Sequence, residues 1–170
     1  MTKRILAIDP GTYCGYAWID VSYPVPNSLQ AIPAQSGVWD LSVKRHEGGG
    51  MRFLRMKKHL LEIEADLILY EEVRGHKGTS AAHIYGGIVG QIQAFGEEHD
   101  INYVAIPVGT IKKKATGKGN ANKEAMVAAA NGMFGCDLSD AKSSKDDNIA
   151  DALWLLQIGI DEYADALEGT

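Results

Sequence analysis

Short apolar runs separated by turn residues recur along the chain and predict buried strands. The first run is followed at once by a glycine turn and by a segment rich in aromatic and β-branched residues, a pattern typical of a tight hairpin. Prolines then interrupt regular structure before the third run, so the first three strands can form a meander. The predicted strands cover residues 5–8, 13–20, 36–41, 67–70 and 101–106.

Longer segments with apolar residues at helical spacing follow the third strand and alternate with the later ones. These predicted helices cover residues 51–65, 80–98, 122–134 and 146–163. Three strands followed by strand–helix units indicate an α/β fold, a mixed sheet with an antiparallel part and helices on its faces. A chain of 170 residues is long enough for a core of its own, so we expect residues 1–170 to form a single domain.

The composition is typical of a globular protein, with 45% hydrophobic and 23% charged residues. No apolar run approaches the ~20 residues that span a membrane, and the basic pair near the N-terminus precedes only a short apolar run, unlike a signal peptide. We therefore expect no membrane association and a location in the cytoplasm. Cys14 and Cys136 are too few for a disulfide framework and lie in contexts typical of reduced thiols.

Positive charge is concentrated in one segment of an otherwise acidic chain. The formal net charge of −5 argues against a protein that coats nucleic acid nonspecifically. Residues 110–123 nevertheless contain no acid and five lysines, which are Lys112, Lys113, Lys114, Lys118 and Lys123. With its glycines and asparagines, the segment predicts a flexible basic loop that leads into a helix near residue 122. Such lysines suit contacts with a phosphate backbone, and the alternative is a solvated surface loop.

Acidic residues stand at the ends of two predicted strands and at the start of the last predicted helix. Asp9 follows the first apolar run and Glu71 the fourth, and ligands bind at the carboxyl ends of neighbouring parallel strands. Asp147 and Asp151 are four residues apart, so they lie on one face of the last helix. For Asp9 the alternative is a turn residue that caps its own backbone, and for Asp147 it is a helix cap. Asp151 lies in an apolar helix, where a charge is costly without a partner.

These acids predict a metal site if the three segments meet. Carboxylates that converge on a half-buried point repel one another unless a cation lies among them. Oxygen-only ligands favour Mg²⁺ or Mn²⁺. Two such ions about 4 Å apart would activate a water and stabilise the leaving oxygen in phosphodiester hydrolysis.

Three short motifs occur in a fixed order along the chain: IDPGTYCGYA at residues 8–17, YEEV at 70–73 and ADAL at 150–153. Together with the lysine-containing segment at 110–123, they resemble the RuvC-type Holliday junction resolvases of the ribonuclease H-like superfamily. The resemblance implies a five-stranded mixed sheet, with three antiparallel strands and then parallel ones, flanked by helices. It also implies a homodimer with two active sites, which nicks paired strands of a four-way DNA junction in a Mg²⁺-dependent reaction. By position, the matching residues are the acids Asp9, Glu71 and Asp151 and the basic residues Lys112 and Lys123.

Two departures from the family pattern add candidate residues. The fourth acid of the family lies three residues before Asp151, where this chain has Asn148. Asn148 could ligate a metal through its neutral oxygen, or the adjacent Asp147 could take over as catalytic residue and ligand. The aromatic residue that the family tends to carry after the strand-four Glu is replaced by Arg74, which we expect to contact DNA together with Lys77. This change fits a nuclease for branched DNA in general, of the kind found in phages and other mobile elements.

Three other functions fit parts of the pattern. The sugar-kinase and actin-like ATPases also carry Asp-x-Gly-Thr after a strand, but they need two such domains, and 170 residues supply one. The change at Asn148 is compatible with a noncatalytic module that binds branched DNA on the same fold. An RNA-processing nuclease is the third, because net charge does not distinguish the two nucleic acids.

Glycines in the predicted helix at 80–98 indicate where two copies of the chain meet. Gly86, Gly87 and Gly90 each weaken a helix by about 1 kcal/mol relative to alanine. They also let another backbone approach closely. We therefore expect this helix to form part of the interface of the homodimer that the resemblance implies.

Overall fold

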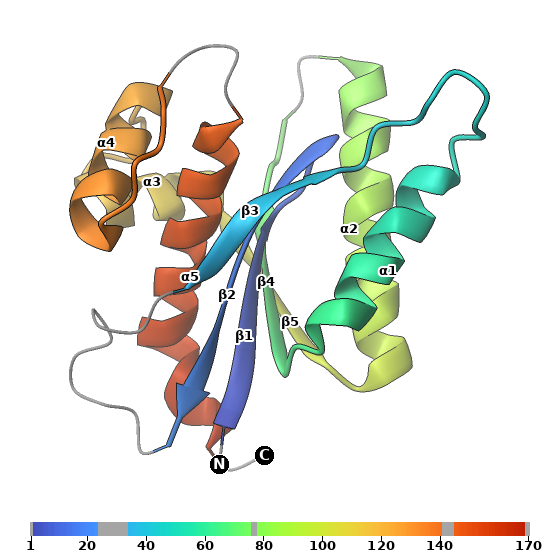
Figure 1. Cartoon of the computed structure of the whole chain (residues 1–170). Coiled ribbons are helices and arrows are strands. Elements are labelled where there is room, and N and C mark those ends of the chain that lie inside the picture. Colours follow the sequence, from blue (N-terminus) through green and yellow to red (C-terminus); the bar gives the residue numbers. More distant parts are fainter. Residues whose placement is uncertain (1, 24–33, 76–77, 141–144, 169–170) are drawn as a thin grey trace.

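The computed structural model describes residues 2–23, 34–75, 78–140 and 145–168. Its five strands form one mixed sheet in the order β3-β2-β1-β4-β5 (Figure 1). The first three pair antiparallel, whereas β1 with β4 and β4 with β5 pair parallel, so the predicted fold class is confirmed. The strands are β1 (Thr2–Asp9), β2 (Tyr13–Ser22), β3 (Gln35–Asp40), β4 (Leu67–Glu72) and β5 (Asn102–Pro107).

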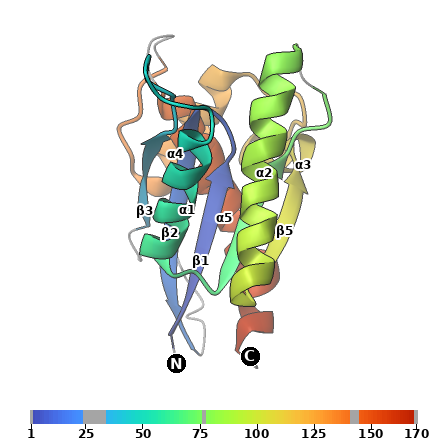
Figure 2. The same cartoon turned by 90° about the vertical axis from the view of Figure 1, so that its right-hand side faces the viewer.

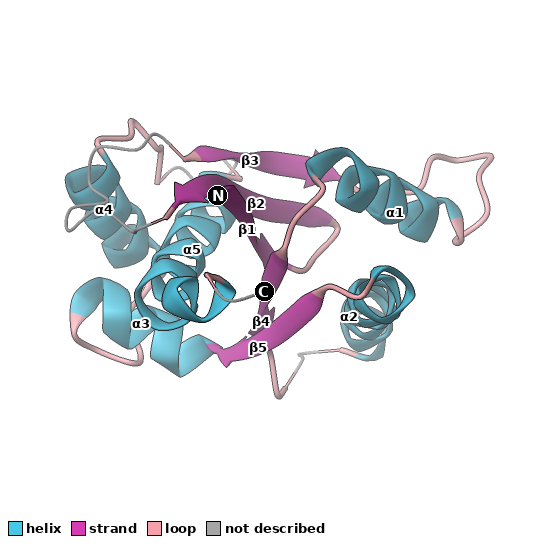
Figure 3. Cartoon of the chain, turned by 90° about the horizontal axis from the view of Figure 1, so that it is seen from below, coloured by secondary structure: helices cyan, strands magenta, loops and turns pink. Residues whose placement is uncertain are grey.

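Helices cover both faces of the sheet, as Figures 2 and 3 show from two sides. On one face lie α1 (Met51–Ile63) and α2 (Thr79–His99). On the other lies α5 (Asp146–Leu167), with α3 (Val108–Thr116) and α4 (Lys123–Phe134) packed beside it. The sheet is therefore the middle layer of three.

Strand β1 runs through the middle of the sheet and supplies both cores. Its side chains alternate between the faces: Ile5 and Ala7 join the core under α5, whereas Leu6 and Ile8 join the core under α1 and α2. All four are fully buried. A strand buried on both faces needs a continuous apolar run, which is the pattern seen at residues 5–8.

Helix α5 approaches the sheet closely because glycines leave room for it. A Cβ atom on Gly15 of β2 would lie 2.0 Å from the backbone oxygen of Asn148, too close for any side chain. Farther along the helix, a Cβ atom on Gly159 would lie 2.6 Å from Leu69 Cδ1. These contacts place the first turns of α5 beside the end of β1, where the sequence has its acids.

The basic segment differs from the prediction, because much of it is helix. Helix α3 covers Val108–Thr116 and includes Lys112, Lys113 and Lys114, so the expected flexible loop was wrong there. Ile111 anchors this helix in the core with 2% of its surface exposed. Gly117 ends it with a left-handed φ of 76°, a conformation that glycine adopts without strain. The short connection that remains leads into α4, which begins near residue 122 as predicted and whose first turn is capped by the side chain of Asn122.

Two smaller expectations also change. Helix α1 ends at Ile63, earlier than predicted, because Glu64 adopts a left-handed conformation with φ of 53°. Gly87 of α2 is explained within the chain, since its missing Cβ leaves space for the ring of Phe53 on α1.

Cys14 is buried and both cysteines are free thiols. Among the described residues, no helix combines the length and the apolar character needed to cross a membrane.

Candidate active site

Parallel pairing of β1 with β4 brings two acids to one edge of the sheet. The paired residues of these strands end with Ile8 and Tyr70. Asp9 and Glu71 each follow directly, so they emerge side by side from the carboxyl ends of neighbouring strands. Asp151 comes to the same edge from the second turn of α5, which the close approach at Gly15 holds in place.

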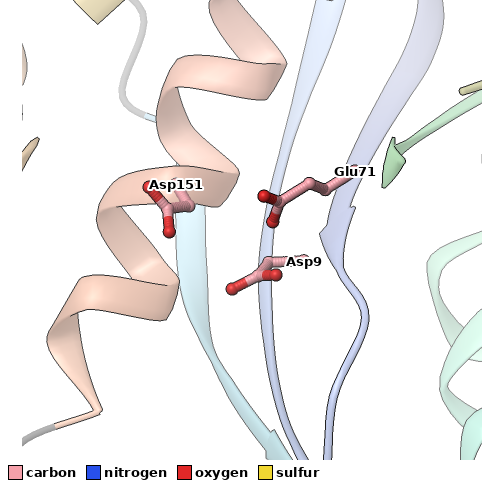
Figure 4. Close-up of side chains that lie close together, drawn as sticks. All are labelled: Asp9, Glu71 and Asp151. Atoms are coloured by element: carbon pink, nitrogen blue, oxygen red, sulfur yellow. The ribbon is translucent and has the colours of Figure 1, made fainter. Parts of the chain in front are cut away.

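The three carboxylates point toward one another (Figure 4). One oxygen of each lies within 4.8 Å of an oxygen of the other two. Glu71 is 9% exposed, and Asp9 and Asp151 are half-buried. Within the described part of the chain, this is the one group of three or more acids, histidines or cysteines arranged so that they could share a metal ion.

The surroundings of Asp9 and Asp151 disfavour the ionised forms of these two acids. Burial, followed by the charges of Glu71 and its neighbours, raises the pKa of Asp9 well above its usual value. Burial and the charges of Glu71 and Asp147 likewise raise the pKa of Asp151 to about 7, although Lys112 and Lys123 oppose the shift. The ionised carboxylates of Asp9 and Asp151 are therefore less stable in this site than they would be in water.

The donor set fits a hard divalent cation. All three groups offer carboxylate oxygens, the ligands that Mg²⁺ and Mn²⁺ prefer. A cation among them would replace mutual repulsion by attraction and would favour the ionised form of each acid. The geometry and the electrostatics thus agree that Asp9, Glu71 and Asp151 could hold a metal.

The two candidates for the fourth position differ in their contacts. Asp147 forms an ion pair with Lys123, and its charge contributes to the raised pKa values of Asp9 and Asp151. Asn148 instead uses its side-chain amide to donate a 2.8 Å hydrogen bond to the backbone oxygen of Tyr13. Asp147 therefore adds negative charge near the three acids, whereas Asn148 ties α5 to the start of β2.

The predicted basic residues separate into three groups. Lys112 and Lys123 lie near enough to Asp151 for their charges to lower its pKa. Lys114 forms a 2.6 Å ion pair with Asp161 of α5 and is thereby held against its own chain. Lys113 and Lys118 are exposed.

The loop after Glu71 carries the other two predicted DNA contacts. Arg74 is exposed and forms a 3.3 Å ion pair with Glu72. Lys77 lies outside the described residues, so its place relative to the acids stays a prediction.

The structure adds residues that the pattern of charges did not reveal. Lys145 lies with its ammonium 4.2 Å from the ring centroid of Tyr13, a cation–π contact that joins the start of α5 to the start of β2. Gly15 permits the approach of α5, and a glycine inside a strand-like run is the signal that indicates such an approach. A cavity of about 580 Å³ also lies between the turn at residues 10–12 and the first turns of α2.

A sheet of order 3-2-1-4-5 with helices on both faces is the ribonuclease H-like fold, and three acids lie together at the carboxyl ends of β1 and β4 and on α5. No family model matches the chain. The chain is 30% identical over 158 residues to the crossover junction endodeoxyribonuclease RuvC of Chlamydia muridarum, a match that covers 91% of this chain and 89% of that protein. The chain therefore belongs to the RuvC family, and the predicted resemblance is confirmed.

Solved structures share the same fold. RuvC of Thermus thermophilus superposes with a TM-score of 0.69 at 22% identity, over 98% of this chain and 97% of that one. The same protein in complex with a Holliday junction substrate superposes with a TM-score of 0.66 at 20% identity, over 90% of both chains. The Holliday junction resolvase of fowlpox virus gives 0.58 at 15% identity, over 93% of this chain and 98% of that one.

Asp151→Asn is expected to stabilise the metal-free protein above neutral pH. The folded protein keeps the Asp151 proton up to about pH 7, whereas the unfolded chain loses it near pH 4. Ionisation thus favours the unfolded chain, and stability falls as pH rises between these values. The neutral amide removes this effect, so we expect a gain on the order of 4 kcal/mol at pH 8 and little change at pH 4.

Thermal unfolding in EDTA at both pH values measures this effect. Asp137→Asn removes the same charge from an exposed position and serves as the matched control. Equal destabilisation of Asp151→Asn at both pH values would contradict the crowding of charge described above.

Proposed function

We propose that this chain resolves four-way DNA junctions by metal-dependent hydrolysis of phosphodiester bonds. The convergence of Asp9, Glu71 and Asp151 at one edge of a RuvC-type sheet is the observation that carries the proposal. Membership of the RuvC family supports an endonuclease acting on DNA. The relatives include a resolvase solved with a Holliday junction substrate, which supports branched DNA as the partner.

The residues of the site have separable roles in this proposal. Asp9, Glu71 and Asp151 would hold Mg²⁺ or Mn²⁺, two ions per site, which supply Lewis-acid stabilisation of the developing charge and a water of lowered pKa. Asp9 is central, because the neighbouring strand β4 brings Glu71 and helix α5 brings Asp151 toward it. Two strands and a helix hold these carboxylates rigidly. The position of the carboxylates in turn fixes where the scissile phosphate must lie.

Lysines around the acids would bind the DNA backbone. Lys112 and Lys123 lie within electrostatic reach of Asp151, so they are placed to neutralise phosphates next to the site. Lys113, Lys118 and Arg74 are exposed and would contact phosphates farther along the arms, as would Lys77. Lys114 is a weaker candidate than the sequence indicated, because Asp161 already pairs with it.

Cleavage of a labelled four-way junction tests the proposed function. The wild type should nick the junction with Mg²⁺ or Mn²⁺ and not with EDTA, and should spare a linear duplex built from the same arms. Asp9→Asn should lower the rate at least roughly a hundredfold, since even outer-shell partners of a metal cost 10–100-fold. Equal cutting of flaps and other branched forms would replace the junction by branched DNA in general, and junction binding without any cutting would indicate a noncatalytic module.

We infer that Asp147, and not Asn148, takes the place of the fourth family acid at the site. Its charge already raises the pKa values of Asp9 and Asp151, and Lys123 balances it. The Asn148 amide is committed to the backbone of Tyr13. The change at residue 148 is thereby compensated from the adjacent position on α5.

Replacing Asp147 and Asn148 separately distinguishes their roles. Asp147→Asn should raise the Mg²⁺ concentration for half-maximal cleavage by roughly tenfold. Asn148→Ala should leave that concentration near the wild-type value and lower the free energy of unfolding by about 1 kcal/mol, because one hydrogen bond is lost. The reverse pattern in metal titrations would assign the fourth position to Asn148.

We also infer a homodimer, because resolution of a junction requires paired nicks in two strands. Gly86 and Gly90 lie on an exposed side of α2, where an added Cβ atom would meet nothing in the same chain. These two glycines support α2 as part of the interface, whereas Gly87 is used internally.

The single nuclease domain over residues 1–170 and the cytoplasmic location stay predictions.

Light scattering after size exclusion measures the assembly. We expect twice the 18.4 kDa mass of one chain for the wild type. Gly90→Arg should shift it toward the monomer by placing a long charged side chain in a close contact, and Gly132→Arg, at an exposed position of α4, is the control. A wild-type monomer at high concentration would remove the mechanism of paired nicking.

The other functions considered are not favoured. The relatives from Chlamydia muridarum, Thermus thermophilus and fowlpox virus are junction nucleases and not ATPases, and membership of the RuvC family supports DNA over RNA. Three of the four family acids are present and lie together, which argues against a noncatalytic module.

A further inference from the structure

Tyr85 of α2 contacts the backbone of Glu71 and of Val73, the residues on either side of Glu72. Glu71 is the residue whose carboxylate belongs to the candidate metal site. The Tyr85 hydroxyl donates a hydrogen bond to the backbone oxygen of Glu71, 2.9 Å away. The same hydroxyl accepts a 2.9 Å hydrogen bond from the backbone N–H of Val73. One side chain therefore joins the second turn of α2 to the end of β4.

These two hydrogen bonds resemble those of a neighbouring strand. In a parallel pair, one residue bonds through its N–H and its C=O to two residues of the partner strand that lie two apart. The hydroxyl of Tyr85 does the same with residues 71 and 73. Strand β4 pairs with β5 as far as Glu72 but with β1 only as far as Tyr70. Glu71 therefore has a paired residue on β5 and none on β1.

The surroundings of Tyr85 suit this contact. The side chain is half-buried, and its hydroxyl, like that of any tyrosine, keeps its proton and can donate at neutral pH. Its ring also lines the cavity between α2 and the turn at residues 10–12, which follows Asp9. Tyr85 thus lies between two segments that present acids to the site.

We propose that Tyr85 is a positioning residue that fixes the backbone of Glu71 and thereby the place of its carboxylate in the metal site. The inference rests on the proposed function, because it assumes that Glu71 binds a metal. Loss of the hydroxyl frees the end of β4, and the carboxylate of Glu71 then has to be ordered when the metal binds. The metal affinity falls, while the three acids and the fold stay in place.

Binding of Mn²⁺ to the DNA-free protein, measured by calorimetry, tests the role of the hydroxyl. Tyr85→Phe keeps the ring and the wall of the cavity, and its dissociation constant for Mn²⁺ should rise roughly tenfold, the lower end of the effect of outer-shell partners. Junction cleavage by this variant should recover toward the wild-type rate when Mn²⁺ is raised by the same factor. A merely structural role would lower the melting temperature and leave the metal affinity unchanged.

Tyr23→Phe is the matched control. The Tyr23 hydroxyl also donates to a backbone oxygen, that of Ala164, but it lies beyond the opposite end of β2 from the site. This variant should bind Mn²⁺ as the wild type does. Wild-type affinity in Tyr85→Phe, or an equal loss in Tyr23→Phe, would overturn the inference.

Hydrogen exchange of the metal-free protein checks the contact itself. The amide of Val73 should exchange roughly tenfold faster in Tyr85→Phe, because it loses its acceptor. Unchanged exchange would overturn the inference whatever the metal affinity. A wild type that binds no Mn²⁺ would instead overturn the proposed function, and with it this inference, so the two failures are distinguishable.

Discussion

Asp9, Glu71 and Asp151 converge on one partly buried point, and the rest of the structure has to hold them there against their mutual repulsion. The three carboxylates have oxygens within 4.8 Å of one another. Burial, followed by the charges of neighbouring acids, raises the pKa values of Asp9 and Asp151, and this costs stability in the metal-free protein. A fold keeps such a cluster only if rigid elements hold it against the repulsion. Two neighbouring strands and a helix do so here, and a bound cation would convert the cost into binding energy.

The packing of α5 gives the cluster its third member. The helix lies so close to the sheet that Gly15 has no room for a Cβ atom, and Asn148 bonds to the backbone of Tyr13 at the same place. Farther along, an apolar body with residues such as Leu153 and Leu155 fixes the helix on the core. The position of Asp151 therefore follows from backbone contacts and from the core together.

Electrostatic balance around the acids comes from elements that flank α5. Lys112 on α3 and Lys123 at the start of α4 both act on Asp151, and Lys123 also pairs with Asp147. Both positive charges favour the ionised form of Asp151, against the burial and the neighbouring acids that raise its pKa. Lys114 is different, because its ion pair with Asp161 joins α3 to α5 and stabilises the arrangement of the two helices.

The sequence alone determined the class of fold and the acids, because both depend on local patterns. The apolar run at residues 5–8 had to be a strand buried on both faces, and a carboxylate directly after such a run lies at a strand end whatever the rest of the chain does. The order of three strands and then strand–helix units likewise left few topologies.

Only the tertiary structure decided what depends on contacts between distant segments. Residues 108–116 form a helix because Ile111 finds a place in the core, which glycines and lysines nearby did not indicate. Asp147 and Asn148 are adjacent in the sequence, yet one meets Lys123 and the other the backbone of Tyr13. The contact of Tyr85 with Glu71 joins residues 14 apart on different elements. A local pattern states which residues carry charge or an apolar side chain, whereas packing in three dimensions selects the partner of each.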